Sequence, residues 1–220
     1  MTAHAPGRLR GPLVVLDADS TLIREEAIEL LAEVAGSLEH VTEVTERAMR
    51  GELDFADSLR ERVATLAGLD VDVLASARER MTPTDGVHEL VDRVHEAGGL
   101  VGVVSGGFHE LLDPLADRLG LDFCRANRLE VSDGRLTGRV DGPIVDATAK
   151  ASALDEWADV SGIPRSRTVA VGDGANDLEM LGRAALGVAF CAKPVVREQA
   201  DVAIDVADLS AVLPLLGLRG

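Results

Sequence analysis

The chain has 220 residues, and its 38 acidic side chains outnumber the 22 basic ones, which gives a formal charge of −16. This charge excludes a general nucleic-acid surface, and an aromatic content of 2% leaves few rings on which single strands could stack. A hydrophobic content of 46% with 27% charged residues is typical of a folded globular protein with one continuous core. The basic residues are 20 Arg and two Lys, Lys150 and Lys193.

Short apolar runs along the chain predict the strands of a parallel sheet. The first, residues 13–16, is continuous and β-branched, as expected of a strand that is buried on both faces. Four further runs follow, at residues 100–104, 168–171, 186–190 and, more weakly, 202–204. Helical patterns long enough for crossovers separate them, at residues 87–97, 108–119 and 148–160. This alternation predicts an α/β fold with a Rossmann-like, doubly wound, mostly parallel sheet.

A helical insertion interrupts the alternation between the first two strands. Residues 25–82 show only helical periodicity, with candidate helices at 27–35, 41–49, 55–67 and 71–80. Asp54 and Asp70 stand directly before two of these helices and are expected to cap them. We therefore expect an α/β core of residues 1–24 and 83–220, with residues 25–82 forming a small helical cap domain.

A second irregularity is a β-hairpin. Residues 129–136 alternate around Asp133-Gly134, a pair that favours a tight turn between two antiparallel strands. Neither irregularity has the low-complexity composition of a linker.

Cysteine and membrane signals are weak. Cys124 and Cys191 match no disulfide or zinc spacing, so two ordinary buried thiols are expected. No apolar run approaches the roughly 20 residues of a membrane span, and no signal-peptide segment follows the first ten residues. We therefore expect a cytoplasmic protein that has no membrane partner and no amino-terminal regulatory domain.

Acidic and glycine-rich turns follow three of the predicted strands. Asp17 and Asp19 come directly after the first strand, residues 105–107 (Ser-Gly-Gly) after the second, and residues 172–177 (Gly-Asp-Gly-Ala-Asn-Asp) after a later one. Ligands of open α/β sheets bind at this edge. Each turn alone could be ordinary turn or capping chemistry, but their joint occurrence favours one shared site.

The predicted site needs a cation. Without a cation, four carboxylates in one place would raise one another's pKa; these are the carboxylates of Asp17, Asp19, Asp173 and Asp177. Oxygen ligands with no His or Cys nearby in the sequence favour Mg²⁺ over Zn²⁺. A carboxylate beside a metal and phosphate-binding backbone groups suggests an aspartyl-phosphate intermediate.

Four motifs in this order resemble the signature of the haloacid dehalogenase-type (HAD) phosphatases. They are Asp17-Ala18-Asp19-Ser20-Thr21, Ser105-Gly106-Gly107-Phe108, Lys150 and Gly172-Asp173-Gly174-Ala175-Asn176-Asp177. Within this superfamily nearly the whole chain, including the helical cap, is similar to the phosphoserine phosphatases. Ala18 departs from the aromatic residue that is common there, but that side chain is not expected to take part in the chemistry.

The resemblance implies Mg²⁺-dependent hydrolysis of O-phospho-L-serine to L-serine and phosphate, the last step of L-serine biosynthesis. Asp17 would be the nucleophile, and Asp19 the acid that protonates the leaving oxygen and then activates water. Asp17, the Asp19 backbone carbonyl and Asp173 would hold Mg²⁺.

The other motif residues would bind the phosphate, by the same resemblance. Ser105 and the Gly106 N–H would bind the transferring phosphoryl group, and Lys150 would neutralise its charge. Asn176 would help to orient the substrate, and Asp177 would fix the loop and Lys150.

Substrate selection would lie in the cap. Glu26 and Arg62 match the family positions that bind the ammonium and the carboxylate of the substrate, and Met49 and Phe55 would shield the closed site from water. By pattern alone, Glu26 could instead be a first-turn helix charge and Arg62 a solvated surface residue.

Other interpretations stay open at this stage. The chain could act on another small phosphomonoester, serve as a non-catalytic phosphate- or metal-binding regulator, or be an interaction protein built on the insertion. His88 and His95 favour packing or surface roles, and His109 could line the entrance. A monomer and a homodimer are both compatible with the sequence.

Overall fold

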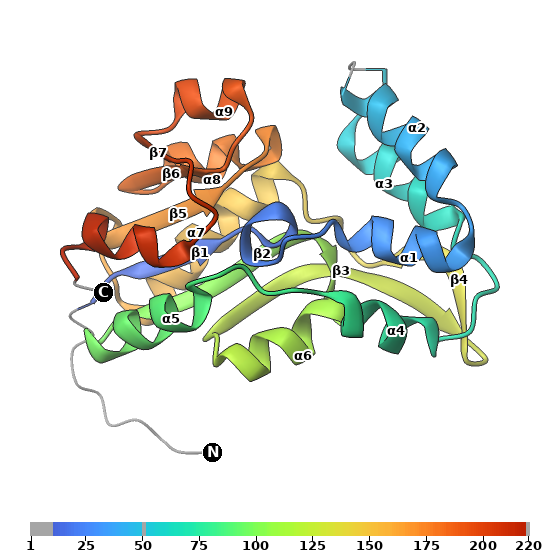
Figure 1. Ribbon diagram of the computed structural model, residues 1–220, viewed down its shortest axis with the longest axis horizontal. Helices are drawn as coiled ribbons and strands as arrows, with labels where there is room; N and C mark the ends of the chain where they lie inside the picture. The colour runs from blue at the N-terminus through green and yellow to red at the C-terminus, as the bar shows by residue number, and fades with distance from the viewer. Residues whose placement is uncertain (1–10, 50–51, 219–220) are drawn as a thin grey trace.

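One seven-stranded sheet forms the centre of the computed structural model, which describes residues 11–49 and 52–218 (Figure 1). The strand order is β4-β3-β2-β1-β5-β6-β7. Their bounds are β1 Leu13–Leu16, β2 Leu100–Phe108, β3 Phe123–Ser132, β4 Arg135–Asp141, β5 Thr168–Gly172, β6 Leu186–Phe190 and β7 Val202–Ile204. Among these strands β4 alone runs antiparallel to its neighbour. The predicted doubly wound, mostly parallel α/β fold is therefore confirmed.

Strand β1 is buried on both faces, and the two faces belong to two apolar clusters. Val14 and Leu16 join the larger cluster, while Leu13 and Val15 join the smaller one. The first face is covered by α5 (Val87–Glu96), α6 (His109–Leu119) and the 3₁₀ segment Leu209–Leu216. The second face is covered by α7 (Ala147–Ser161), α8 (Leu178–Arg183) and α9 (Pro194–Gln199). Continuous rather than alternating hydrophobicity in β1 follows from this two-sided burial.

The described residues of the insertion between β1 and β2 form four helices, as the sequence predicts. They are α1 Ala27–Ala35, α2 Leu38–Met49, α3 Phe55–Ala64 and α4 Val73–Arg80. Asp54 caps α3, and its side chain accepts a hydrogen bond from the Asp57 N–H at 2.8 Å. The prediction for Asp70 is wrong: α4 begins at Val73, and the Asp70 carboxylate accepts from the Asp72 N–H in the preceding turn.

The insertion leaves and rejoins the sheet at one place. The Arg24 N–H donates to the Thr82 carbonyl at 3.0 Å, and Ile23 forms an isolated bridge with Pro83. These pairs lie at the expected boundaries of 25 and 82. Helices α2 and α3 lie side by side and project away from the sheet beyond α1 (Figure 1), while the apolar side chains of α3 share one cluster with the sheet. Division into two domains stays a prediction.

The β3–β4 hairpin is confirmed, with Asp133 and Gly134 at φ 49° and 75°, as a tight two-residue turn requires.

Both cysteines were expected to be buried, and this is wrong: Cys124 is partly exposed, and Cys191 lies exposed in the turn after β6. None of the helices in the described ranges is long and apolar enough to cross a membrane.

Candidate active site

The three predicted turns converge at the carboxyl ends of β1, β2 and β5. The Asp17 N–H donates to the Val171 carbonyl at 2.9 Å, which continues the contact with β5 one residue beyond the end of β1. A cavity of about 310 Å³ opens here between the sheet edge and the insertion. Its wall includes, from the sheet side, Asp17, Asp19, Gly106, Asp173 and Asn176 and, from the insertion, Glu26, Phe55 and Arg62.

A buried lysine joins two of the acidic turns. Lys150 Nζ lies 2.5 Å from Asp17 Oδ1 and 2.7 Å from Asp177 Oδ1, and all three side chains are at most 5% exposed. Burial raises the pKa of Asp17 well above its usual range, and the charge of Asp177 raises it further. Burial alone would lower the pKa of Lys150, but the two carboxylates outweigh it and keep the ammonium charged. One cation thus serves two buried anions.

Asp19 and Asp173 face the same cavity. Burial, followed by the charge of Glu26, raises the pKa of Asp19 to about 7, although its Oδ1 accepts a hydrogen bond from the Ala27 N–H at 2.9 Å. Burial, followed by the charge of Asp177, raises the pKa of Asp173 to about 6. Both carboxyls therefore hold protons more tightly than usual at neutral pH.

The acidic cluster has the donor set of a hard divalent cation. One carboxylate oxygen from each of Asp17, Asp173 and Asp177 lies within 4.8 Å of the others. Asp177 is already engaged, because Oδ1 accepts from Lys150 and Oδ2 accepts from the Gly174 N–H at 3.0 Å. Asp17 and Asp173 are then the two side chains left to coordinate an ion. A site that offers only oxygen donors, and whose neighbouring carboxylates repel one another, suits Mg²⁺.

Ser105, Gly106 and Gly107 form a turn beside this cluster. Ser105 is fully buried, and its Oγ accepts a hydrogen bond from the Gly107 N–H at 2.8 Å. A Cβ on Gly106 would lie 2.7 Å from Phe55 Cζ. The ring of Phe55 thus lies against this turn, and its role as a shield stays a prediction.

Charged side chains of the insertion face the cavity from the other side. Glu26 accepts a hydrogen bond from Ser20 Oγ at 2.8 Å, and Ser20 holds a positive φ of 57° to reach it. Arg62 Nε donates to the Ser58 carbonyl at 3.2 Å on the preceding turn of α3. Burial lowers the pKa of Arg62, and the charges of Glu26 and Asp19 oppose this. The side chain of Met49 lies outside the described residues.

Sequence reasoning missed three residues near the cavity. Lys193 lines it, and its N–H donates to the Asp173 carbonyl at 3.2 Å. Ser20 Oγ donates to Glu26, and Asn127 Nδ2 donates to the Gly106 carbonyl. The rarity of lysine was a usable signal for Lys193. No local pattern marked Asn127, which lies in a polar stretch of β3.

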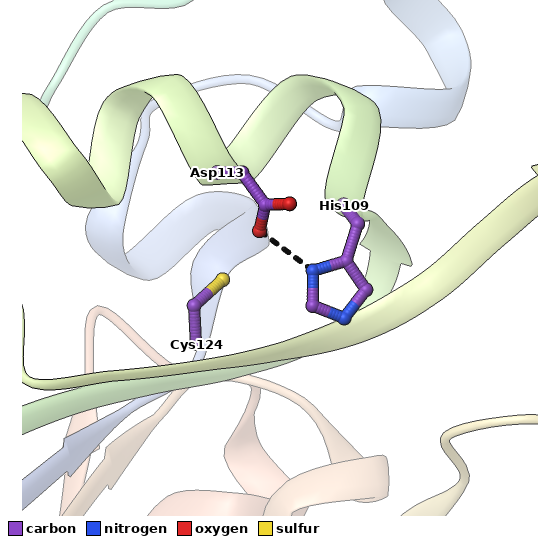
Figure 2. Close-up of side chains that lie close together, drawn as sticks. All are labelled: His109, Asp113 and Cys124. Atoms are coloured by element: carbon purple, nitrogen blue, oxygen red, sulfur yellow. Dashed lines mark hydrogen bonds and ion pairs between the residues drawn. The ribbon is translucent and has the colours of Figure 1, made fainter.

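None of the histidines in the described residues lines the cavity. His109 was expected to be able to line the entrance, but Figure 2 shows it beside Asp113 and Cys124. Its Nδ1 lies 2.6 Å from Asp113 Oδ1, and its Nε2 accepts from the Ala126 N–H at 3.1 Å. A metal on Nδ1 would require the proton on Nε2, where it would face that N–H. We therefore interpret this cluster as a structural contact between α6 and β3 rather than as a metal site.

His88 and His95 lie at the surface, one of the two roles that the sequence favours for them. His88 is exposed on α5, and His95 Nε2 lies 2.8 Å from Asp122 Oδ2 with the ring 35% exposed.

Comparisons with known proteins agree with this geometry. The family model of the haloacid dehalogenase-like hydrolases matches residues 14–182. A phosphoserine phosphatase of Streptomyces coelicolor is 56% identical over 206 residues, which are 94% of this chain and 50% of the relative. A phosphoserine phosphatase of Streptococcus thermophilus is 52% identical over 204 residues, 93% of this chain and 95% of the relative.

A solved structure described as a phospho-aspartyl intermediate analogue of phosphoserine phosphatase has a TM-score of 0.89 and 42% identity, covering 96% of this chain and 100% of that chain. The chain thus spans about half the length of the Streptomyces relative. It spans nearly all of the Streptococcus relative and of the solved structure.

Proposed function

The chain belongs to the haloacid dehalogenase-like hydrolase family, and from this premise we propose that it hydrolyses O-phospho-L-serine to L-serine and phosphate. The reaction is the last step of L-serine biosynthesis. One observation carries the proposal: a single cavity brings Asp17 and Asp19 together with Glu26 and Arg62. The first pair suits phosphoryl transfer, and the second pair suits the ammonium and carboxylate of an amino acid.

Asp17 is the nucleophile of the proposed reaction. Lys150 engages its Oδ1, so Oδ2 is the oxygen that attacks phosphorus. The bond between phosphorus and the serine oxygen breaks, and Asp19 delivers its proton to that oxygen. A carboxyl with a pKa of about 7 holds a proton to deliver at neutral pH. Asp19 then takes a proton from the water that attacks the aspartyl phosphate, which releases phosphate and restores Asp17.

The transferring phosphoryl group is held by the turn and by fixed charges. Ser105 and the Gly106 N–H bind its oxygens, Lys150 offsets its negative charge, and Asn176 orients the substrate. Asp17, Asp173 and the Asp19 backbone carbonyl hold Mg²⁺, and Asp177 fixes Lys150 and the Gly174 N–H. When bound, Mg²⁺ supplies positive charge that stabilises the phosphoryl oxygens.

Residues of the insertion select the amino acid. Glu26, held by Ser20, binds the substrate ammonium, and Arg62 binds its carboxylate in a two-pronged contact. Phe55, and by the same proposal Met49, excludes water when the site is closed. A phosphorylated amino acid is a charged metabolite of the cell interior, so we place the reaction in the cytoplasm.

The specificity claim is tested by comparing O-phospho-L-serine with phosphoethanolamine, which lacks the carboxylate. We expect a higher kcat/KM for phosphoserine and loss of this preference in Arg62→Met, by about 10- to 100-fold for a charged hydrogen bond. Arg60→Met is the matched control, because Arg60 lies two residues away on the same helix and pairs with the exposed Asp57.

The three alternative interpretations give different results in this assay. A phosphatase of another small phosphomonoester would treat the two compounds equally in wild type and variant. A non-catalytic phosphate- or metal-binding regulator, or an interaction protein, would release phosphate from neither.

A further inference from the structure

Strands β2 and β3 lose their regular pairing where β2 reaches the active site. Val104 pairs with Arg125, and the next pair joins Phe108 to Asn127. The chain thus advances four residues on β2 and two on β3, so the turn 105–107 bulges out of the ladder. A bulge leaves backbone groups that need other partners.

The side chain of Asn127 is the partner of one of these groups, the Gly106 carbonyl. Its Nδ2 donates to the Gly106 carbonyl at 2.8 Å, and its Oδ1 accepts from the Val145 N–H at 2.8 Å. The residue is 1% exposed. Because one partner is a donor and the other an acceptor, the orientation of the carboxamide is fixed. Asn127 therefore ties the turn to the segment that leads into α7 and Lys150.

The bond to Gly106 acts on Ser105 through one peptide plane. The peptide between Gly106 and Gly107 is trans, so its C=O and N–H point in opposite directions. With the carbonyl held by Asn127, the Gly107 N–H is directed to Ser105 Oγ, which accepts it at 2.8 Å. One lone pair of the hydroxyl oxygen is thereby engaged on the side of Gly107, and the hydroxyl hydrogen can be donated to a ligand.

We propose that Asn127 is a positioning residue for phosphate binding, which holds the Gly106–Gly107 peptide so that the Ser105 hydroxyl donates to the phosphoryl group. The inference rests on the proposed function for the role of the turn. Asn127 does not line the cavity and acts on the substrate only through Gly106, Gly107 and Ser105.

Two variants separate the two bonds of Asn127. Asn127→Asp keeps an acceptor for the Val145 N–H but sets a carboxylate oxygen against the Gly106 carbonyl, so the peptide must turn away. Asn127→Leu removes both bonds at similar volume. We expect Asn127→Asp to lower kcat for phosphoserine by about 10- to 100-fold, as for loss of one donor to the transferring group. The preference for phosphoserine over phosphoethanolamine stays unchanged, because Arg62 is not affected.

Thr168→Val is the matched control for lost stability. Thr168 is 1% exposed at the far end of β5, where its hydroxyl also donates one hydrogen bond, to the Arg165 carbonyl, and accepts one, from the Ala185 N–H. We expect Thr168→Val to lower Tm by as much as the Asn127 variants do, because it also loses two buried hydrogen bonds, while its kcat stays at the wild-type value. Equal kcat in Asn127→Asp, Asn127→Leu and Thr168→Val would overturn the proposal.

A binding experiment tests the same claim without turnover. Inorganic phosphate is titrated, with Mg²⁺ present, into protein labelled with ¹⁵N-glycine. We expect the Gly106 and Gly107 amide signals to shift in wild type and Thr168→Val, with at least about tenfold weaker binding in Asn127→Asp. Wild-type protein that binds phosphate but leaves phosphoserine intact would refute the proposed function alone. Unchanged affinity in Asn127→Asp would refute the role of Asn127 alone.

Discussion

Lys150, one of only two lysines beside 20 arginines, occupies a position that suits a lysine better than an arginine. Lys150 is 1% exposed and lies between Asp17 and Asp177, and its Nζ contacts one oxygen of each carboxylate. A compact ammonium fits such a buried gap, whereas a planar guanidinium would need a fork of acceptors. Lys193, the other lysine of the chain, lines the same cavity at its exposed rim. Both lysines therefore serve one acidic site.

The raised pKa values predict that the metal-free protein loses stability as pH rises. Asp19 and Asp173, with pKa values of about 7 and about 6, keep protons in the folded state that the unfolded chain releases near pH 4. A raised folded pKa adds stability below the unfolded value, and this stability is lost as pH rises through the folded value. We expect Tm in EDTA to fall between pH 5 and pH 7.5, and Mg²⁺ to raise Tm more at pH 7.5 than at pH 5.

Asn variants isolate this effect from other titrating groups. In EDTA, Asp19→Asn and Asp173→Asn carry no proton at the altered site, so each is expected to show a smaller fall in Tm over the same pH range. A wild-type slope equal to the slope of both variants would contradict the assigned pKa values.

Helix α3 contacts, through the ring of Phe55, the bulge that residues 105–107 form near the end of β2. The φ of Gly106 permits any residue, but a Cβ there would lie 2.7 Å from Phe55 Cζ. We expect Gly106→Ala to push α3 outward and lower kcat/KM by about tenfold, in line with an overpacking cost of about 1–3 kcal/mol. Adding Phe55→Ala to that variant makes room for the methyl group and is expected to recover part of the loss.

A double-mutant cycle measures this coupling. The kcat/KM values of wild type, the two single variants and the double variant give the interaction between the two positions. Losses that simply add would mean that the methyl group blocks phosphate directly rather than through α3.

The elements that the sequence predicts well are those with long, regular patterns. Strand β1 and helix α1 have the predicted ends, because continuous apolar residues and helical spacing mark them without ambiguity. Strand β3 was expected only from residue 129, yet it begins at Phe123. Its first half contains Arg125, Asn127 and Arg128, whose polarity hides a strand that pairs with β2.

At the scale of the whole molecule, topology rather than local pattern assembles the site. Central strand β1 lies between β2 and β5, so three turns far apart in the sequence meet at one edge. The sequence predicts that meeting because parallel strands share a carboxyl end. It does not predict Asn127, whose importance depends on a register shift between two strands. The resemblance implies the contact of Lys150 with Asp177, but not the second contact with Asp17, since that is set by distances in the fold.

Because the net charge is −16, the positive groups that bind an anionic substrate must be gathered at the site itself. A phosphorylated amino acid is repelled at long range by such a chain, and screening confines attraction to groups within about 10 Å. Lys150, Lys193 and Arg62 lie at or beside the cavity, together with the oxygen ligands for a divalent ion. A small anion is thus the ligand that this molecule can hold.

Identification of the phosphorylated residue during turnover tests the central claim most directly. The protein is mixed with O-phospho-L-serine and Mg²⁺, quenched in acid within one turnover and digested for mass spectrometry. We predict one added phosphoryl group on the peptide that contains Asp17, sensitive to hydroxylamine, and neither this adduct nor turnover in Asp17→Asn. Rapid hydrolysis of phosphoserine by Asp17→Asn, or an adduct on another residue, would contradict the account.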